Sequence, residues 1–331
     1  MANDTPRPPE EIRNFRDTFF KIRDELAAVF VGHRDIVTDL IAAVAADGHI
    51  LLEGVPGLGK TLLARSLAGT LKLKFSRIQF TPDLMPADIT GAMQLEEDEH
   101  GSPHLVFRPG PLLANLVLAD EINRTTPRTQ SALLEAMQEH QITSADKTLK
   151  LPEPFVVIAT QNPIEQEGTY PLPEAELDRF LVKLDLGYPA EEEYARIIDL
   201  TTGTAGKEVR PVCSGPEILA MRRTVRQVIA GDATKAHAVK LVIATQPGSK
   251  YATEETNRKL QRGAGPRAAQ ALILMAKVHA LLDGRAAIGT SDIDRAALPV
   301  LRHRVALDFE ARMAGESADG ILKKILKDIR D

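Results

Sequence analysis

The sequence predicts an α/β protein in which a parallel sheet of five strands is sandwiched by helices and followed by a smaller, all-helical domain. Three observations predict this fold. Short apolar runs alternate with helical patterns between residues 49 and 186, a glycine-rich loop joins the first run to a helix, and the pattern beyond residue 188 is all-helical. Such alternation is typical of a parallel sheet with helices on both faces.

The first residues, 1–9, are polar and rich in proline, which predicts a disordered start. Apolar side chains then recur every three or four positions and predict helices over 12–29 and 34–46. The apolar runs predicted to be strands are 49–53, 75–80, 116–119, 155–160 and 181–186, and a helix is predicted over 130–139. The sequence therefore divides into a disordered start, a core domain over 10–188 and a helical domain over 189–331.

Two segments interrupt the alternation. Residues 82–115 are too long for a plain connection and contain several glycines and prolines, and such long connections are usually functional. Residues 140–154 alternate apolar and polar side chains around a polar centre and predict a hairpin.

Composition limits the functional classes. The net charge of −5 gives no reason to expect nucleic acid or an anionic membrane as the main partner, and the acidic run 96–99 would repel phosphates. Cys213 is the single cysteine, so no intrachain disulfide can form, which fits a reducing compartment. No secretory signal and no apolar run of about 18 residues is found, so we expect a cytoplasmic chain with no transmembrane segment.

The strongest local signal is the loop GVPGLGKT at residues 54–61, which lies between a predicted strand and a predicted helix. This context supports a phosphate-binding loop, because small glycines let backbone N–H groups close around phosphate oxygens. Lys60 is expected to reach the β- and γ-phosphates, and Thr61 to hold Mg²⁺. The residues assigned to the nucleotide here are Gly54, Val55, Pro56, Gly57, Leu58, Gly59, Lys60, Thr61 and Leu62.

Polar residues follow two other strands. Asp120 and Glu121 end the strand at 116–119, where Asp120 is placed to hold Mg²⁺ and Glu121 to orient or deprotonate the attacking water. Acids also end strands with no catalytic role, and the pair gains this meaning from the phosphate loop before it. Asn162 follows the strand at 155–160 and is expected beside Glu121, because carboxyl ends of parallel strands share one edge; an ordinary Asn-Pro turn is the alternative.

Together these residues resemble the Walker A, Walker B and sensor 1 elements of AAA+ ATPases, and finer stretches resemble the MoxR family. Six motifs carry the resemblance, in family order: 81–91 (TPDLMPADITG), 114–124 (ANLVLADEINR), 129–139 (TQSALLEAMQE), 158–163 (IATQNP), 172–180 (LPEAELDRF) and 263–268 (GAGPRA). The resemblance spans about residues 30–310. It implies a P-loop AAA+ core with a helix-2 insert at 82–115, a pre-sensor-1 hairpin at 140–154, and a helical lid packed over the nucleotide.

The resemblance also implies roles for arginines that spacing alone does not assign. Arg179 is similar to an arginine finger that reaches the neighbouring subunit's site, and Arg267 to a sensor 2 arginine. Both would neutralise charge during phosphoryl transfer. Arg124 and Arg128 follow the acid pair, and whether they contact a neighbour or only solvate a helix stays open.

By resemblance, the chain is expected to be a magnesium-dependent ATP hydrolase that forms a ring, with six subunits as the expected number, and remodels protein partners, including proteins with a von Willebrand A domain. No aromatic–apolar–glycine pore loop is visible, so local remodelling is favoured over threading. A nucleotide-gated binding module is the alternative function, and a DNA motor is a weaker one. The sequence names no partner and contains no purine-reading motif.

Overall fold

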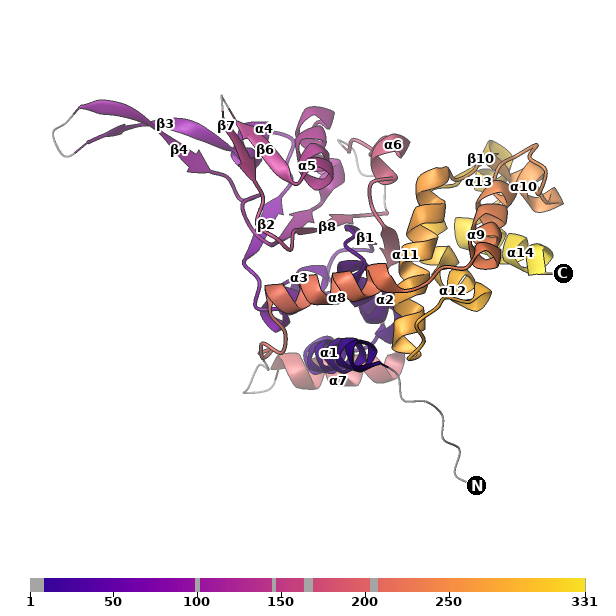
Figure 1. The fold of residues 1–331 in the computed structure, drawn as a ribbon. Coiled ribbons are helices and arrows are strands. Elements are labelled where there is room, and N and C mark those ends of the chain that lie inside the picture. The colour runs from indigo at the N-terminus through magenta and orange to yellow at the C-terminus, as the bar shows by residue number, and fades with distance from the viewer. Residues whose placement is uncertain (1–8, 99–101, 145–146, 164–168, 203–207, 331) are drawn as a thin grey trace, which may run out of the picture.

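The computed structural model of the chain describes residues 9–98, 102–144, 147–163, 169–202 and 208–330. Within these residues, an α/β part that contains the central sheet is joined to a helical part at the carboxyl end (Figure 1). Of the start predicted to be disordered, only Pro9 is among the described residues. None of the described helices is both long and apolar enough to cross a membrane.

The central sheet has five parallel strands in the order β2, β5, β8, β1, β9. Their bounds are β1 Ile50–Glu53, β2 Phe75–Gln79, β5 Leu116–Asp120, β8 Val156–Gln161 and β9 Val182–Asp185. Each strand matches a predicted apolar run closely, and the five-stranded parallel sheet is confirmed. Because all strands run the same way, their carboxyl ends meet at one edge.

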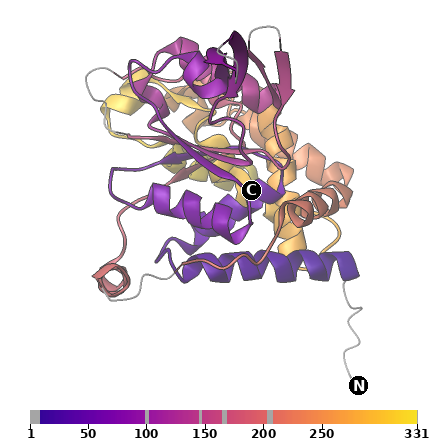
Figure 2. The same ribbon diagram turned by 90° about the vertical axis from the view of Figure 1, so that its left-hand side faces the viewer.

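Helices cover both faces of the sheet because its central strands are apolar on both sides. Along β5, Leu116 and Leu118 contact one apolar cluster, and Val117 and Ala119 contact the other. Helices of the first cluster are α1 (Glu10–Ala27), α2 (Arg34–Ala45) and α3 (Lys60–Thr70), and those of the second are α4 (Pro86–Thr90) and α5 (Pro127–Glu139). Figure 2 shows α1 lengthwise along the bottom of the molecule, below α3.

Two antiparallel hairpins extend from the second face. The predicted hairpin at 140–154 contains β6 (Gln141–Ser144) and β7 (Lys147–Lys150). The long connection at 82–115 contains a second hairpin, β3 (Gly91–Glu97) and β4 (Pro103–Pro109), which projects far from the sheet (Figure 1). This longer hairpin was not predicted.

The helical part includes helices on the core as well as a separate bundle. Its elements are α7 (Glu191–Thr202), α8 (Gly215–Gln227), α9 (Asp232–Ala244), α10 (Glu254–Lys259), β10 (Leu260–Arg262), α11 (Pro266–Leu282), α12 (Thr290–Leu301), β11 (Ala306–Leu307), α13 (Phe309–Met313) and α14 (Ala318–Arg330). Helix α8 packs against α1 and α2, and α7 lies near the carboxyl end of α1 (Figure 2). The helices α9–α14 form the bundle, and the short ribbon of β10 and β11 is its one departure from an all-helical pattern among the described residues.

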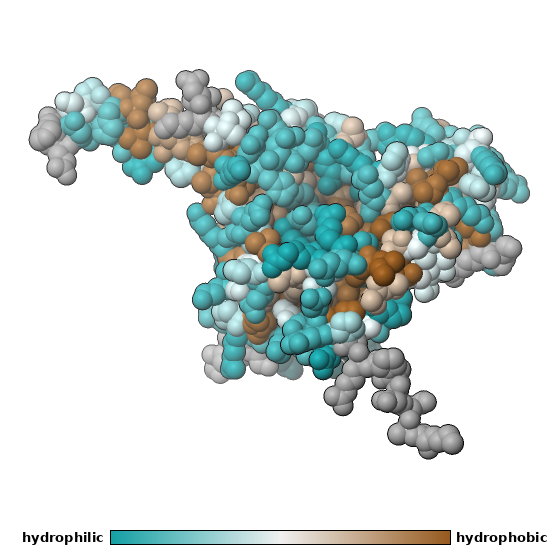
Figure 3. All heavy atoms as spheres, in the orientation of Figure 1, coloured by the Kyte–Doolittle hydropathy of each residue, from teal (hydrophilic) through white to brown (hydrophobic). Residues whose placement is uncertain are grey.

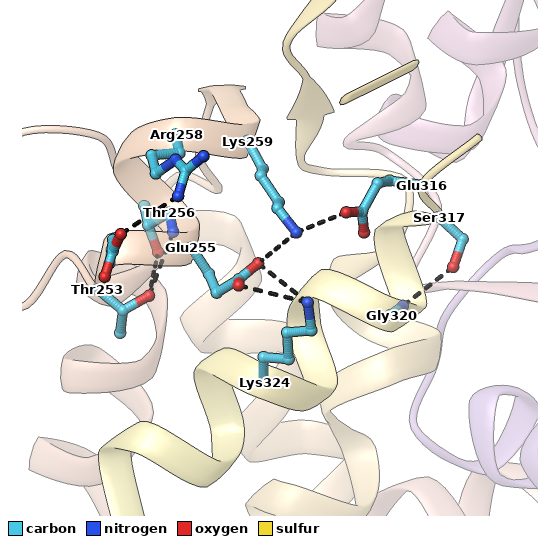
Figure 4. A network of polar contacts seen from close by, with 10 residues as sticks. Thr253, Glu255, Thr256, Arg258, Lys259, Glu316, Ser317, Gly320 and Lys324 are labelled. Carbon is cyan, nitrogen blue, oxygen red and sulfur yellow. Dashed lines mark hydrogen bonds and ion pairs between the residues drawn. The ribbon is translucent and has the colours of Figure 1, made fainter. Parts of the chain in front are cut away.

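Charged side chains join the last helix to the rest of the bundle (Figure 4). Lys259 of α10 lies between Glu255, at 2.9 Å, and Glu316, at 2.5 Å, and Lys324 of α14 lies 3.3 Å from Glu255. Since these side chains are partly exposed and screened by solvent, the pairs contribute little to stability. The apolar face of α14, with Ile321, Leu322 and Ile325 fully buried, is the main attachment.

Candidate functional site

The loop predicted to bind phosphate connects β1 to α3. Gly57 and Gly59 have left-handed backbones, with φ of 88° and 83°, which glycine adopts without strain. Gly59 directly precedes α3, and the first N–H groups of a helix have no partner inside it. Leu58 of the loop packs on the core, and Leu62, in the first turn of α3, is exposed. The backbone therefore has the turn and the helix end that an anion site requires.

Lys60 is the first residue of α3 and its ammonium group lies within the loop. Nζ donates to the backbone oxygen of Gly54 at 2.6 Å and approaches the Gln161 oxygen at 3.5 Å. Partial burial lowers the pKa of Lys60, while the nearby carboxylates of Asp120, Glu121 and Glu53 act to raise it. The ammonium is thus held between the loop and an acidic strand edge, where a phosphate chain would meet it.

Thr61 and Asp120 face each other across this edge. The Thr61 hydroxyl lies 3.5 Å from Asp120 Oδ2, and Thr160 donates to Asp120 Oδ1 at 2.6 Å. Arg77 of β2 also donates to Asp120 Oδ2, at 2.7 Å from Nη2. A hydroxyl and a carboxylate oxygen are the hard donors that Mg²⁺ prefers beside phosphate oxygens, so these two residues fit that ion.

Glu121 follows Asp120 and is held on three sides. Its backbone is left-handed, with φ of 57°, and its N–H donates to the Thr160 hydroxyl at 2.8 Å. Its carboxylate accepts from Gln79 at 3.0 Å and from Arg124 at 3.0 Å. Arg124 therefore pairs with the acid of its own chain, whereas Arg128 is exposed at the start of α5.

Asn162 follows β8 at this same edge of the sheet, directly after Gln161, whose backbone oxygen Lys60 approaches. The structure thus gathers Lys60, Thr61, Asp120, Glu121 and Asn162 where the strands end. Sequence reasoning missed Arg77 and Gln79, which contact both acids. Their signal was the alternation along β2, which places these two polar side chains on one face at its carboxyl end.

Arg179 and Arg267 lie at the opposite edge, where the strands begin. They line one cavity of about 210 Å³ together with Gly48, His49 and Arg304. The guanidinium of Arg179 donates to the Leu134 backbone oxygen of α5 at 2.9 Å. This cavity gathers arginines that sequence reasoning assigned to charge neutralisation.

The strand β1 separates the two groups. His49 lines the arginine cavity and Gly54 begins the phosphate loop. The five residue steps from His49 to Gly54, at about 3.3 Å each, span about 16 Å. Arg267 therefore does not lie over the phosphate loop of its own chain, as a lid packed over the nucleotide would require. The expected lid placement is wrong because the bundle packs against α2 and β9 through α11 and α12.

A second cavity, of about 460 Å³, borders the phosphate loop. Its lining joins the turn after α1 to α7, and includes Ala28, Phe30, Gly32, Arg196 and Leu200. The Phe30 ring lies 3.2 Å from the point where a Cβ of Gly59 would stand, which places the cavity next to the loop. Sequence reasoning missed this cavity because its walls lie far apart along the chain.

Comparison with known proteins gives consistent matches over nearly the whole chain. The family model "ATPase family associated with various cellular activities (AAA)" matches residues 49–182, and the model "AAA lid domain" matches residues 253–325. The uncharacterized protein YeaC of Bacillus subtilis (strain 168) is 42% identical, covering 94% of this chain and 93% of that protein. Chaperone MoxR1 of Mycobacterium tuberculosis is 37% identical over 92% and 80% of the two chains.

Two further matches agree with these. Protein MoxR of Methylorubrum extorquens is 31% identical and covers 94% of each chain. The crystal structure of a candidate ATPase from Cytophaga hutchinsonii ATCC 33406 superposes with a TM-score of 0.88 at 39% identity, covering 96% of each chain. The likeness therefore extends through both the sheet and the helical bundle.

Proposed function

This chain belongs to the MoxR family of AAA+ ATPases, and we propose that it is a magnesium-dependent ATP hydrolase that assembles into a six-membered ring and remodels protein partners. The observation that carries the proposal is the grouping of Lys60, Thr61, Asp120 and Glu121 at the carboxyl edge of a parallel sheet. That edge is where ligands bind in such sheets.

In this proposal each residue has a separate task. Lys60 binds the β- and γ-phosphates, and Thr61 and Asp120 hold Mg²⁺, which neutralises charge on the phosphate oxygens. Glu121 orients the attacking water, with Gln79 fixing its carboxylate and Asn162 close by. Arg179 and Arg267 are supplied by the neighbouring subunit, because their cavity opens at the opposite edge of the sheet. We place the reaction in the cytoplasm.

We assign the cavity beside Phe30 to the base of the nucleotide. Leu200→Ala is expected to raise the KM for ATP about tenfold with kcat at saturation unchanged, because it removes about 1.4 kcal/mol of apolar contact. Steady-state kinetics measure this, and inhibition by inorganic tripolyphosphate, which has no base, should be unaltered.

Ile198→Ala is the matched control, since Ile198 lies on the same helix, is exposed and does not line the cavity. An equal rise in the KM for ATP for both variants would show that the substitutions act by disturbing the packing of α7 and not by removing a contact to the base. An unchanged KM for Leu200→Ala would remove the base from this cavity.

The partner surface we favour is the hairpin of β3 and β4. Met93 pairs with Phe107 and Leu95 with Leu105, which places four apolar side chains on one face. Leu95 and Leu105 are 69% and 64% exposed, and Figure 3 shows brown apolar side chains on this arm. An apolar face suits local contact with a protein, such as one with a von Willebrand A domain. The acidic residues Glu96, Glu97 and Asp98 disfavour nucleic acid, and so a DNA motor.

A nucleotide-gated scaffold, whose shape a partner reads, is the alternative function. Glu121→Gln distinguishes the scaffold from the remodelling ATPase, because this variant is expected to bind ATP without hydrolysing it. We expect this variant to lose all ATP-dependent recovery of a heat-denatured reporter luciferase, and Arg312→Ala, on the exposed surface of α13, to retain it. Full recovery by the trapped form would exclude the remodelling function and support the scaffold.

A further inference from the structure

Two consecutive residues just after α12 (Thr290–Leu301), His303 and Arg304, contact the segment that carries Arg179. This segment, residues 178–181, is called the finger loop below, and it joins α6 (Glu174–Leu177) to β9. Arg304 is its main contact and is only 5% exposed. Its guanidinium donates to Asp178 Oδ1 at 2.7 Å, to the Phe180 oxygen at 2.6 Å and to the Leu181 oxygen at 3.1 Å. One side chain therefore holds the residues on both sides of Arg179.

His303 adds a further bond to the same loop. Its Nε2 lies 3.1 Å from the Phe180 oxygen, and since a carbonyl only accepts, Nε2 carries the proton. Complete burial, and then the charge of Arg304, lower the pKa of His303 well below its usual range, so the ring is neutral. The neutral ring is a fixed donor to the finger loop at physiological pH.

Arg302 fastens the strand that follows. It donates to the Lys183 oxygen at 3.2 Å, lies 3.2 Å from Asp185 Oδ2, and pairs with Asp319 of α14 at 2.7 Å. Arg262 of β10 also pairs with Glu174 of α6, ahead of the loop. The helical bundle thus contacts Glu174, the finger loop and β9, so a movement of the bundle would be passed to the finger loop.

From these contacts we propose that Arg304 is a positioning residue, which fixes Arg179 relative to the neighbouring subunit's nucleotide and transmits bundle movement to it. The inference rests on the proposed role of Arg179 in the neighbour's site. Arg304 itself touches no reacting atom. It acts through Asp178 and Phe180, and it also lines the cavity that contains Arg179 and Arg267.

The chemistry of the side chain explains why arginine is needed. A guanidinium presents five N–H donors in a rigid fork, and Arg304 spreads them over a carboxylate and several carbonyls, including the Val300 oxygen of α12 at 2.5 Å. A lysine would keep the charge beside Asp178 and lose the fork. We therefore expect Arg304→Lys to loosen the loop while it keeps a positive charge beside Asp178.

The test uses mixed assemblies in which one kind of subunit supplies Arg179 to the nucleotide site of the other kind. Acceptor subunits carry Arg179→Ala, so they keep an intact site and have no finger. Donor subunits carry Glu121→Gln, so they keep an intact finger and cannot hydrolyse ATP. We expect Arg304→Lys placed in the donor to lower the recovered kcat about 10- to 100-fold, since a misplacement of about 1 Å costs up to 10²-fold. The KM for ATP should not change.

The same substitution placed in the acceptor should leave the recovered kcat unchanged, because the acceptor's finger is already absent. A merely structural role would act equally in both subunits. Asp178→Asn in the donor weakens the same Arg304–Asp178 contact from the side of the finger loop. It should lower the recovered kcat as Arg304→Lys does. Arg285→Gln in the donor is the control, because it breaks the ion pair between Arg285 and the buried Asp292 within the bundle and does not touch the finger loop.

Three results would overturn the inference. Equal recovery with parent and Arg304→Lys donors, or an equal loss from donor and acceptor, would exclude positioning by Arg304 and leave the proposed function intact. No recovery even with the parent donor, in subunits shown to co-assemble, would overturn both, because Arg179 would then not act in a neighbour's site.

Discussion

Mixing subunits that carry Arg179→Ala with subunits that carry Glu121→Gln is expected to restore ATPase activity that neither variant has alone. Loss of the finger in Arg179→Ala should lower turnover by about 10³- to 10⁵-fold, which corresponds to roughly 4–7 kcal/mol of barrier. Glu121→Gln is expected to bind ATP without hydrolysing it. Arg179 lies at the edge where the strands begin and Glu121 at the edge where they end, so a complete site needs two chains.

The size of the recovery can be stated in advance. In a ring built from identical head-to-tail interfaces, a random equal mixture gives about one quarter of the interfaces both intact groups. Phosphate release measured across mixing ratios should peak near that fraction of the wild-type rate. Arg312→Ala, which is exposed on α13, should behave as wild type in every mixture. Absence of recovery, with differently tagged subunits shown to copurify, would contradict the shared site.

Lys60→Ala is expected to weaken binding of MgATP about 10- to 150-fold and to abolish measurable turnover. A charge-assisted hydrogen bond contributes about 1.5–3 kcal/mol, and Lys60 is the one cation that contacts the phosphate loop among the described residues. Titration with a fluorescent ATP analogue, with and without Mg²⁺, measures the affinity.

Lys74→Ala is the matched control for Lys60→Ala. Lys74 is exposed just before β2, and its side chain lies away from the phosphate loop, so affinity and turnover should equal those of wild type. If Lys60→Ala bound MgATP as tightly as wild type, or if chelation of Mg²⁺ left wild-type affinity unchanged, the proposed nucleotide site would be excluded.

The sheet could be predicted because its signals are local. Each strand is a short apolar run, and Gly54, Asp120 and Gly187 directly follow three of the five runs. Such patterns can be recognised without any knowledge of distant residues. The phosphate loop lies within eight consecutive residues, 54–61, so the positions of its glycines predict the backbone turn. Positions of residues at the strand ends then follow from parallel topology alone.

The remaining features depend on contacts between distant segments. Arg77 reaches Asp120 only once β2 and β5 pair, and Phe30 and Leu200 line one cavity only once α7 packs near the carboxyl end of α1. The position of Arg267 depends on how the helical bundle docks on the core, which no local pattern determines. The β3–β4 hairpin could have been predicted from a local pattern, because apolar side chains alternate at Met93, Leu95, Leu105 and Phe107.

The packing of α12 and of the residues after it against β9 also protects the sheet from association with the strands of other chains. β9 is an outermost strand, and unpaired carbonyl and N–H groups on such strands recruit other chains into aggregates. Arg302 and Arg304 occupy the carbonyls of Lys183 and Leu181 with side-chain donors, which cannot propagate a sheet. A shortened chain that lacked α12 would lose this shield, so the isolated sheet domain is a poor target for expression, and the bundle contributes to solubility as well as to turnover.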